Sequence, residues 1–351
     1  MKLSDLTLDR DGLTAALACT DPAFNEALRQ EACRVKVAHV GNQVYLRGLI
    51  EISNRCRKNC LYCGIRRENA ACARYELSEE EVLAAASYAA AQRFGSVVIQ
   101  GGERSDAPFI RKITRLVKAI KAIETENGLP LGVTLSLGEQ PREVYAEWFD
   151  AGAHRYLLRI ESSNPDLYRK IHPQDALHRY ERRLEALDDL KAIGYQAGTG
   201  VMIGLPYQTA SDLADDLLFF QRFDAPMIGM GPYNPNAETP LTLLGAPYPS
   251  DAERLALGLK MIALLRLLMP DINIAAATAL EVLSPRGREL GLLSGANIIM
   301  PNVTPTEQMV KYNLYDRKTL LRDRQLNDVL QNDQLTLGFG QWGDSKHFKK
   351  R

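Results

Sequence analysis

The chain has 351 residues, of which 46% are apolar and 25% are charged, and its 43 Lys and Arg balance its 43 Asp and Glu. This composition is typical of a soluble globular enzyme, and a net charge of zero argues against a nucleic-acid or anionic-membrane partner. The N-terminus has no apolar signal segment, and the most apolar stretch, 255–270, is interrupted by Lys260 and Arg266. We therefore expect a cytoplasmic protein that does not span a membrane.

From residue 43 onward, short apolar segments alternate with helix-forming segments. Strands are predicted at 44–53, 96–100, 131–137, 154–160, 196–204, 226–231, 272–278 and 296–300. Helices are predicted at 77–95, at 107–126 and from Pro141 to near Gly152. Helical segments are also predicted between the fourth strand and about residue 193, and at 209–222, 250–268 and 286–294. The first of these has a capping box of Ser78 and Glu81 and a stop at Gly95. Eight alternations predict an α/β fold with a parallel sheet, a TIM-type (β/α)₈ barrel, with an open doubly wound sheet as the alternative.

No linker, repeat or low-complexity tract divides the chain, so we predict a single domain over 1–351. The expected parts are a helical N-terminal extension (1–42), the barrel (43–315), and a C-terminal helix and tail (316–351).

The cysteines are concentrated early in the chain. They are Cys19, Cys33, Cys56, Cys60, Cys63 and Cys72, and none follows residue 72, which indicates a reducing compartment and one local metal site. Three of them form CxxxCxxC directly after the first strand, at the barrel end where active sites lie. Three thiolates leave one iron of a cubane [4Fe–4S] cluster open for a ligand. Structural zinc is the alternative, but it needs a fourth ligand and usually a second cysteine pair, which this sequence lacks.

The CxxxCxxC spacing with Tyr62 before the last cysteine resembles the signature of the radical S-adenosylmethionine (SAM) superfamily. The resemblance implies one [4Fe–4S] cluster on Cys56, Cys60 and Cys63, with SAM chelated to the open iron. It also implies reductive cleavage of SAM to a 5′-deoxyadenosyl radical, no catalytic side chain beyond cluster and SAM, and a reductant such as ferredoxin or flavodoxin.

Further positions suit SAM binding. Gln100, Gly101, Gly102 and Glu103 follow the second strand and resemble the superfamily's GGE motif, in which glycine allows close approach and Glu accepts from an ammonium. Arg159 and Glu161 can share one face of the fourth strand, so that Glu161 could accept from ribose hydroxyls. Arg183 could hold the methionine carboxylate with a bidentate fork. The resemblance also places Tyr62 and Met202 near adenine.

Longer blocks of sequence resemble one particular family within the superfamily. They are EISNRCRKNCLYCGIRREN, VTLSLGEQPREVYAEW, AGAHRYLLRIESSNPDLYRKIHP, GLPYQT, IGMGPYNPNAETPL and GANIIMPNVTPTEQMVKYNLY, with GQWGDSKHF near the end. Together they resemble the [FeFe]-hydrogenase maturase family HydE, which is close to methylornithine synthase and biotin synthase. This implies a role in assembly of the H-cluster diiron subcluster, on a small anionic iron–CO–cyanide–cysteine complex made by a partner maturase.

We expect the substrate to bind inside the barrel, because hydroxyls and guanidinium groups can hold an anion in a dry cavity. The candidate residues are Arg47, Thr134, Ser136, Arg159, Thr278, Tyr312 and Tyr315.

Two departures from the family matter. No cysteine is available downstream for a second cluster, and Ile160 stands where some relatives have His, which puts a His-dependent contact there in doubt.

Alternatives remain open at this stage. A carbon-skeleton mutase resembling methylornithine synthase would share the barrel and act on an amino acid. Sulfur insertion resembling that of biotin synthase is disfavoured, because it uses a second cluster. A non-catalytic iron–sulfur scaffold or carrier would have no use for a GGE loop or a ribose-binding carboxylate. The sequence does not decide between an iron complex and an amino acid as substrate.

Overall fold

The computed structural model describes residues 1–318 and 335–350. The helix predicted between 316 and 351 falls mainly on 319–334, outside the described residues.

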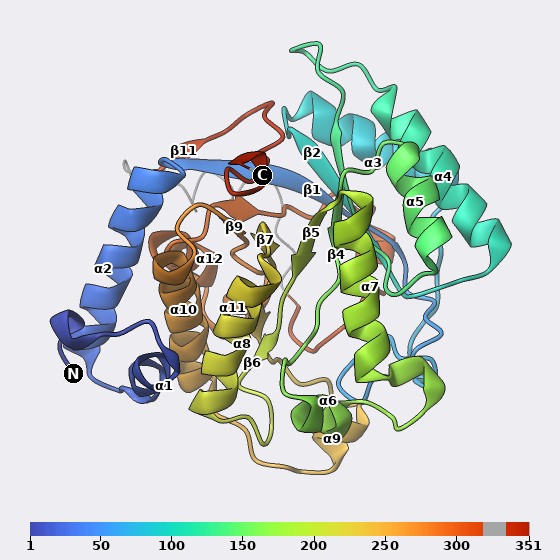
Figure 1. Ribbon diagram of the computed structural model, residues 1–351. Coiled ribbons are helices and arrows are strands. Elements are labelled where there is room, and N and C mark those ends of the chain that lie inside the picture. Colours follow the sequence, from blue (N-terminus) through green and yellow to red (C-terminus); the bar gives the residue numbers. More distant parts are fainter. Residues whose placement is uncertain (319–334, 351) are drawn as a thin grey trace.

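The core is a ring of parallel strands (Figure 1). They are β1 (Gln43–Ser53), β2 (Ser96–Gly101), β3 (Gly132–Ser136), β4 (Arg155–Leu157), β5 (Gln196–Thr199), β7 (Met227–Ile228), β9 (Asn273–Ile274) and β10 (Ile298–Ile299), in the order β10-β1-β2-β3-β4-β5-β7-β9. A bridge from Ala275 to Ile298 and the Ala276 N–H bond to the Ile298 carbonyl close the ring between β9 and β10. The paired β6 (Met202–Ile203) and β8 (Gly231–Pro232) follow β5 and β7 in sequence. The predicted (β/α)₈ barrel is confirmed.

Helices follow the strands and cover the barrel. Their bounds are α3 (Glu79–Ala91), α4 (Ala107–Lys121), α5 (Arg142–Asp150), α6 (Pro165–Ile171), α7 (Tyr180–Ile193), α8 (Ala210–Phe223), α9 (Pro240–Leu243), α10 (Asp251–Leu268), α11 (Ala279–Leu283), α12 (Gly287–Leu293) and α13 (Thr306–Met309). The predicted capping box of Ser78 and Glu81 starts α3. The predicted stop at Gly95 is wrong, because α3 ends at Ala91 and Arg93 takes the left-handed conformation. Gly95 instead allows close approach of Gln341, whose backbone a Cβ would strike.

The N-terminal residues form α1 (Arg10–Ala18) and α2 (Pro22–His39), each capped by an aspartate, Asp9 and Asp21. In Figure 1 both lie outside the barrel, where α1 packs on α8 and α2 packs on α10. None of the helices in the described ranges is long and apolar enough to cross a membrane.

The C-terminal tail closes the end of the barrel at which the strands begin. Its short strand β11 (Thr336–Leu337) pairs with the start of β1. The Gly343 carbonyl accepts from Arg47 Nη2 (3.1 Å) and Asn273 Nδ2 (2.8 Å), and Asp344 Oδ1 lies 2.6 Å from Arg155 Nη1. Figure 1 shows this tail at the opposite end from α6 and α9, so the other end of the barrel is left to form a site.

Candidate active site

The carboxyl-terminal ends of the strands surround a cavity of about 320 Å³. Its wall contains every residue that the sequence predicted for the cluster and for SAM, and five of the seven predicted for the substrate. These are Cys56, Cys60, Cys63, Tyr62, Gln100, Gly101, Gly102, Glu103, Glu161, Arg183 and Met202, with Ser136, Arg159, Thr278, Tyr312 and Tyr315. The barrel therefore brings together side chains that are up to 259 residues apart in the chain.

The three cysteines lie on the loop that joins β1 to α3. The Cys63 N–H donates to the Cys60 carbonyl (3.3 Å), and the Glu103 N–H donates to Cys56 Sγ (3.3 Å). All three are free thiols. Burial, together with the neighbouring Cys56, raises the pKa of Cys60 to about 12. Such thiols ionise only when cations compensate them, which fits a group of bound metal ions.

The arrangement of the donors suits a cluster better than a single metal ion. Among residues 1–318 and 335–350, no three His, Cys, Asp or Glu side chains converge on a position for one ion. A cubane cluster takes each cysteine sulfur on a different iron, so its ligands do not need to converge on one point. The zinc alternative requires a closed tetrahedral set.

Arg74 holds the cysteine loop in shape from within. Its Nη1 donates to the carbonyls of Asn54 (2.6 Å) and Ile65 (2.8 Å), on the two sides of the cysteines. A guanidinium has five donors in a fixed plane, so one side chain can satisfy several carbonyls of a loop that lacks regular structure. The sequence reasoning gave this arginine no role.

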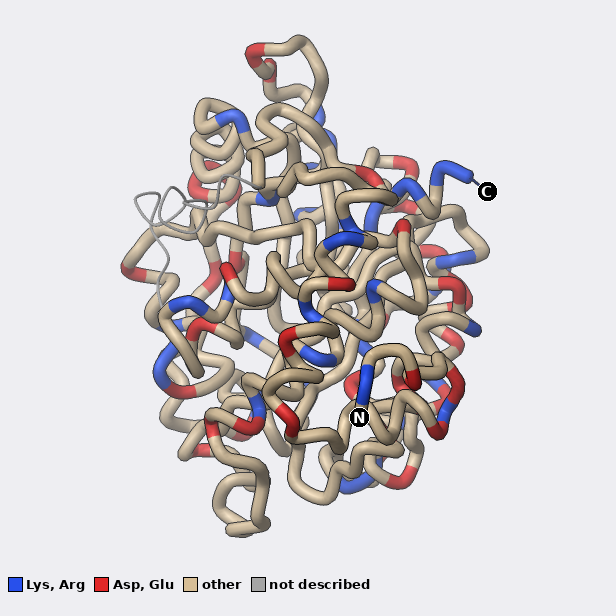
Figure 2. The backbone as a smooth tube through the Cα atoms, turned by 90° about the vertical axis from the view of Figure 1, so that its left-hand side faces the viewer, with Lys and Arg blue, Asp and Glu red and all other residues tan. Residues whose placement is uncertain are grey.

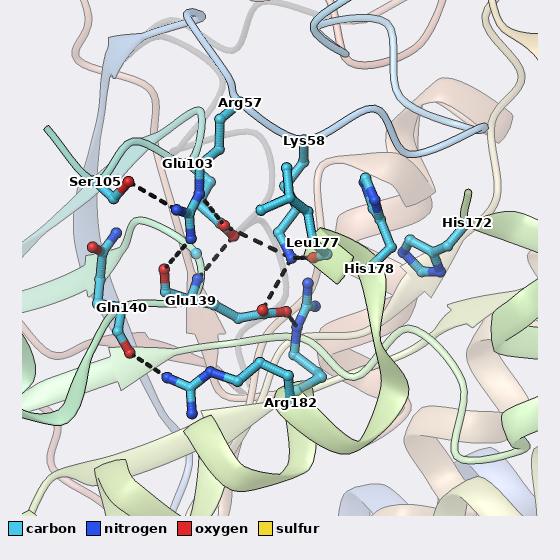
Figure 3. Close-up of polar contacts among 12 residues, drawn as sticks. Arg57, Lys58, Glu103, Ser105, Glu139, Gln140, His172, Leu177, His178 and Arg182 are labelled. Atoms are coloured by element: carbon cyan, nitrogen blue, oxygen red, sulfur yellow. Dashed lines mark hydrogen bonds and ion pairs between the residues drawn. The ribbon is translucent and has the colours of Figure 1, made fainter. Parts of the chain in front are cut away.

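Five charged side chains, four of them buried, form a network next to the cysteine loop. Figure 3 shows Arg57, Lys58, Glu103 and Glu139 of this network. Arg57 Nε lies 2.9 Å from Glu103 Oε1, and Lys58 Nζ lies 3.0 Å from Glu139 Oε2 and 3.7 Å from Glu103 Oε1. Arg183 Nε lies 2.5 Å from Glu139 Oε1. Burial opposes ionisation of Glu139, but Arg183 and Lys58 more than offset it and keep its pKa below the ordinary value. Three cations against two carboxylates leave this network with one positive charge, and Lys58 and Arg183 of it line the cavity.

Glu103 is more fully engaged than the sequence predicted. Besides its ion pairs, its Oε2 accepts the Glu139 N–H (2.8 Å). Gly138, with φ of 78°, packs directly against this side chain, where a Cβ would clash. A ligand ammonium would therefore share Glu103 with Arg57 rather than meet a free carboxylate.

Arg159 and Glu161 face the cavity from the end of β4. Arg159 Nη2 lies 3.1 Å from Glu161 Oε2, yet this buried oxygen has no hydrogen-bond partner in the described chain. Glu161 has a φ of 66°, a conformation that costs on the order of 1–3 kcal/mol in a residue other than glycine and that clusters at functional sites. Its N–H donates to the Gly200 carbonyl (3.0 Å), and its carbonyl accepts from the Met202 N–H (3.1 Å). The site thus presents a fixed acceptor to the cavity.

The cavity wall also contains charged residues that the sequence reasoning missed. Glu51 of β1 is ion-paired to Lys318 and accepts from Asn302 Nδ2 (2.9 Å). Arg288 donates to Thr278 Oγ1 (2.8 Å) and lies 3.0 Å from Glu281. Lys58 and Glu139, in the network beside the cysteines, were missed as well. Glu51 and Glu139 each carry a signal that could have revealed them, because both are acidic residues at or just beyond the end of a buried strand, as Glu103 is.

Two predicted substrate residues lie outside this cavity. Thr134 Oγ1 accepts from Arg155 Nε (2.9 Å), and Arg47 bonds to Gly343 of the tail, so both belong to the closed end of the barrel. Each points into the barrel, as predicted, but nearer to where its strand begins. Ile160 packs in the hydrophobic core and is absent from the cavity wall.

Comparison with known proteins agrees with this geometry. The model of the radical SAM superfamily matches residues 50–220. The HydE subunit of the [FeFe]-hydrogenase maturase of Thermotoga maritima is 44% identical over 318 residues, which cover 90% of this chain and 86% of that protein. The chain belongs to the HydE family.

As a HydE-family protein, the chain is a radical SAM enzyme, and membership implies an iron–sulfur cluster and SAM as cofactors. The 3-methylornithine synthase of Methanosarcina barkeri is 27% identical, over 87% of this chain and 83% of that protein. The crystal structure of methylornithine synthase (PylB) superposes with a TM-score of 0.77 at 25% identity, covering 93% of this chain and 92% of that one. The fold of this chain therefore also occurs in methylornithine synthase.

Proposed function

We propose that this HydE-family chain binds one [4Fe–4S] cluster on Cys56, Cys60 and Cys63 and cleaves SAM there. The observation that carries the proposal is that the carboxyl-terminal end of the barrel unites these thiols with Lys58 and Arg183 and with Glu161, whose buried Oε2 accepts no hydrogen bond from the described chain. When bound, cluster and SAM supply a 5′-deoxyadenosyl radical. The lack of any cysteine after residue 72 supports a single cluster.

Different residues of the chain bind different parts of SAM. Arg183, with the extra positive charge of its network, holds the carboxylate of the methionine moiety. Glu161 Oε2 accepts from the ribose hydroxyls, and Glu103 and the glycines before it receive the amino group. Tyr62 and Met202 belong to a small apolar cluster with Leu205 and give adenine a flat, dry surface.

Beyond SAM, the cavity suits a small anionic substrate. Arg159 Nε is buried without a hydrogen-bond partner, and Ser136, Thr278, Tyr312 and Tyr315 offer hydroxyls nearby in the same cavity. The tail closes the other end of the barrel, which keeps water away from reactive intermediates. We infer that the substrate is a mononuclear iron–CO–cyanide–cysteine complex supplied by a partner maturase, and that the product goes towards the diiron subcluster.

Anaerobic reconstitution followed by dithionite and SAM tests this proposal. Formation of 5′-deoxyadenosine is expected. A bound cluster without SAM cleavage would indicate a scaffold or carrier, and conversion of lysine to methylornithine would indicate a mutase instead.

A further inference from the structure

Arg288 is a buried arginine of the cavity wall that has no role in the proposed binding of SAM. It lies in α12, and only 2% of it is exposed. On the side of the molecule that Figure 2 draws, basic and acidic residues are interspersed, and the sequence has no net charge. No broad charged region of that surface therefore attracts an anion, and single charges inside the cavity decide which ligand binds.

The three nitrogen atoms of the Arg288 guanidinium have different surroundings. Nε lies 3.0 Å from Glu281 Oε2, and Nη2 donates to Thr278 Oγ1 (2.8 Å). Nη1 is buried and has no hydrogen-bond partner in the part of the chain that the structure describes. Because a buried donor of a charged group is costly when it stays unpaired, Nη1 is suited to contact a ligand in the cavity.

The ion pair of Arg288 presents its positive end to the cavity. Its partner Glu281 is buried in α11 and is absent from the cavity wall, which contains Arg288 and Thr278. Among the described residues, the carboxylates that line the cavity have ion-pair partners of their own: Glu51 with Lys318, Glu103 with Arg57, and Glu161 with Arg159. No unpaired carboxylate of this wall therefore opposes an anion at Arg288.

Thr278 supplies a second donor beside Nη1. Its Oγ1 accepts from Arg288 Nη2, which leaves the hydroxyl hydrogen to donate to a ligand. The neighbouring wall residues are small, and a Cβ at Gly231 would lie 3.0 Å from the Cβ of Ala277 and 3.3 Å from that of Ala279. This part of the wall therefore combines two adjacent donors with little side-chain bulk.

The two donors lie close to the rest of the proposed substrate site. Burial, followed by Glu51, raises the pKa of Tyr315. Arg288 and Arg159 oppose this rise in the pKa, so both guanidinium groups lie near the phenol. A small molecule at Tyr315 is therefore within reach of Arg288 on one side and of Arg159 on the other.

We propose that Arg288 and Thr278 bind the carboxylate of a substrate that contains an amino acid, with Arg288 Nη1 and Thr278 Oγ1 each donating to one carboxylate oxygen. The inference rests on the proposed function, and it assigns the cysteine carboxylate of the iron complex to this wall. A charged donor beside a neutral donor matches the two oxygens of a carboxylate. Glu281 is a positioning residue, because it contacts the guanidinium and lies outside the cavity wall.

The test uses the reconstituted full-length protein with SAM and without a reductant. The probes are a synthetic iron–CO–cyanide–cysteine complex and its counterpart with cysteamine, which lacks the carboxylate. Equilibrium dialysis, followed through the infrared bands of CO and cyanide, measures the Kd of each probe. Arg288→Gln removes the charged donor, and Arg286→Gln is the matched control. Arg286 is also paired to a glutamate, Glu289 (2.7 Å), but its side chain is 68% exposed.

We expect wild type to bind the cysteine probe at least tenfold more tightly than the cysteamine probe. Arg288→Gln should lower this ratio to less than threefold, because the carboxylate loses its charged partner, whereas Arg286→Gln should keep the wild-type ratio. Iron content and the Kd for SAM check that each variant is folded. A ratio near one in wild type, or an undiminished ratio in Arg288→Gln, would overturn the proposal.

A double variant separates binding from a structural role of the buried pair. Glu281→Gln/Arg288→Gln leaves neither charge buried alone, so it should fold even if Arg288→Gln does not. A purely structural pair predicts the wild-type ratio of the two Kd values in this double variant, and that result would overturn the carboxylate site. The proposal predicts that the ratio again falls below threefold.

A second pair of probes separates this test from that of the proposed function. If wild type binds neither iron complex, the proposed substrate fails, and the same variants are then compared with L-lysine and cadaverine, which also differ by a carboxylate. A preference for L-lysine that Arg288→Gln removes would support the carboxylate site alone. Equal binding of L-lysine and cadaverine, or binding of neither, would overturn it.

Discussion

Arg183 and Glu139 form a buried ion pair, in which Arg183 Nε lies 2.5 Å from Glu139 Oε1. This pair joins α7 to the loop after β3. Glu139 also receives Lys58 of the cysteine loop (3.0 Å), so one carboxylate links three segments of the site. Neither Arg183 nor Glu139 is among the residues that would bind the cluster directly.

Glu139→Gln should destabilise the protein strongly. It leaves Lys58 and Arg183 buried with less compensation, and breaking a buried pair in this way costs about 3–5 kcal/mol. Urea denaturation of the cluster-free protein measures the free energy of unfolding. Glu143→Gln, at an exposed position of α5, is the control and should stay within about 0.5 kcal/mol of wild type. Equal stability of the two variants would show that the network is not structural.

Glu161→Gln should weaken SAM binding and leave the cluster in place. Its carboxylate lies outside the cysteine loop, and the loss of charge-assisted hydrogen bonds of about 1.5–3 kcal/mol corresponds to a roughly 10- to 150-fold rise in Kd. Equilibrium dialysis with SAM and an iron assay on the same samples measure both quantities. Glu185→Gln on α7 is the exposed control. Unchanged SAM affinity in Glu161→Gln would remove Glu161 from the SAM site.

Only three of the six cysteines should matter for the cluster. Serine at Cys56, Cys60 or Cys63 should abolish reconstitution, whereas wild type should reach about four irons per chain, as one cubane cluster requires. Cys19, Cys33 and Cys72 are free thiols outside the cavity wall, and serine there should leave the iron content unchanged. An iron content near eight in folded wild-type protein would contradict the single cluster.

Asp216 should make stability depend on pH. Burial raises its pKa to about 7 from an ordinary 3.8, and its Oδ1 accepts the Ser163 N–H (2.6 Å) just after Glu161. The folded chain keeps this proton up to about pH 7 while the unfolded chain releases it near 3.8. The stabilisation is therefore complete below about pH 4 and is lost as the pH rises to 7, by about 1.4 kcal/mol per unit.

Asp216→Asn should remove this slope, so its advantage over wild type should grow between pH 5 and pH 7. Urea midpoints of the cluster-free proteins measure the effect. Asp215→Asn is the control, because Asp215 lies in an exposed pair with Arg10 (2.7 Å). Parallel pH profiles of wild type and Asp216→Asn would mean that Asp216 is ionised in the folded protein.

The position of the site could be predicted from the sequence because motif residues follow strands directly. Cys56, Glu103 and Glu161 each come just after a strand, and parallel strands of a barrel end on one side. It was harder to predict how far along its strand a side chain lies, and so which end of the barrel it faces. Thr134 and Ser136 share a face of β3 but stand about 7 Å apart, so Ser136 reaches the cavity while Thr134 meets Arg155 at the closed end.

The role of the tail could not be predicted from local patterns. Arg47 looked like a substrate residue because a guanidinium inside a dry barrel could hold an anionic ligand, but it donates instead to the Gly343 carbonyl, 296 residues away. Such a long-range contact leaves no trace in periodicity or spacing. The same holds for Arg183, whose ion pair with Glu139 spans two βα units.

Activation of apo-hydrogenase in a defined maturation mixture, with this protein as the only variable, tests the central claim most directly. The account predicts that wild type activates the hydrogenase, and that Ser136→Ala impairs activation far more than it impairs SAM cleavage in the absence of substrate. The claim is contradicted if wild type cleaves SAM but gives no active hydrogenase, most clearly if it also converts lysine to methylornithine.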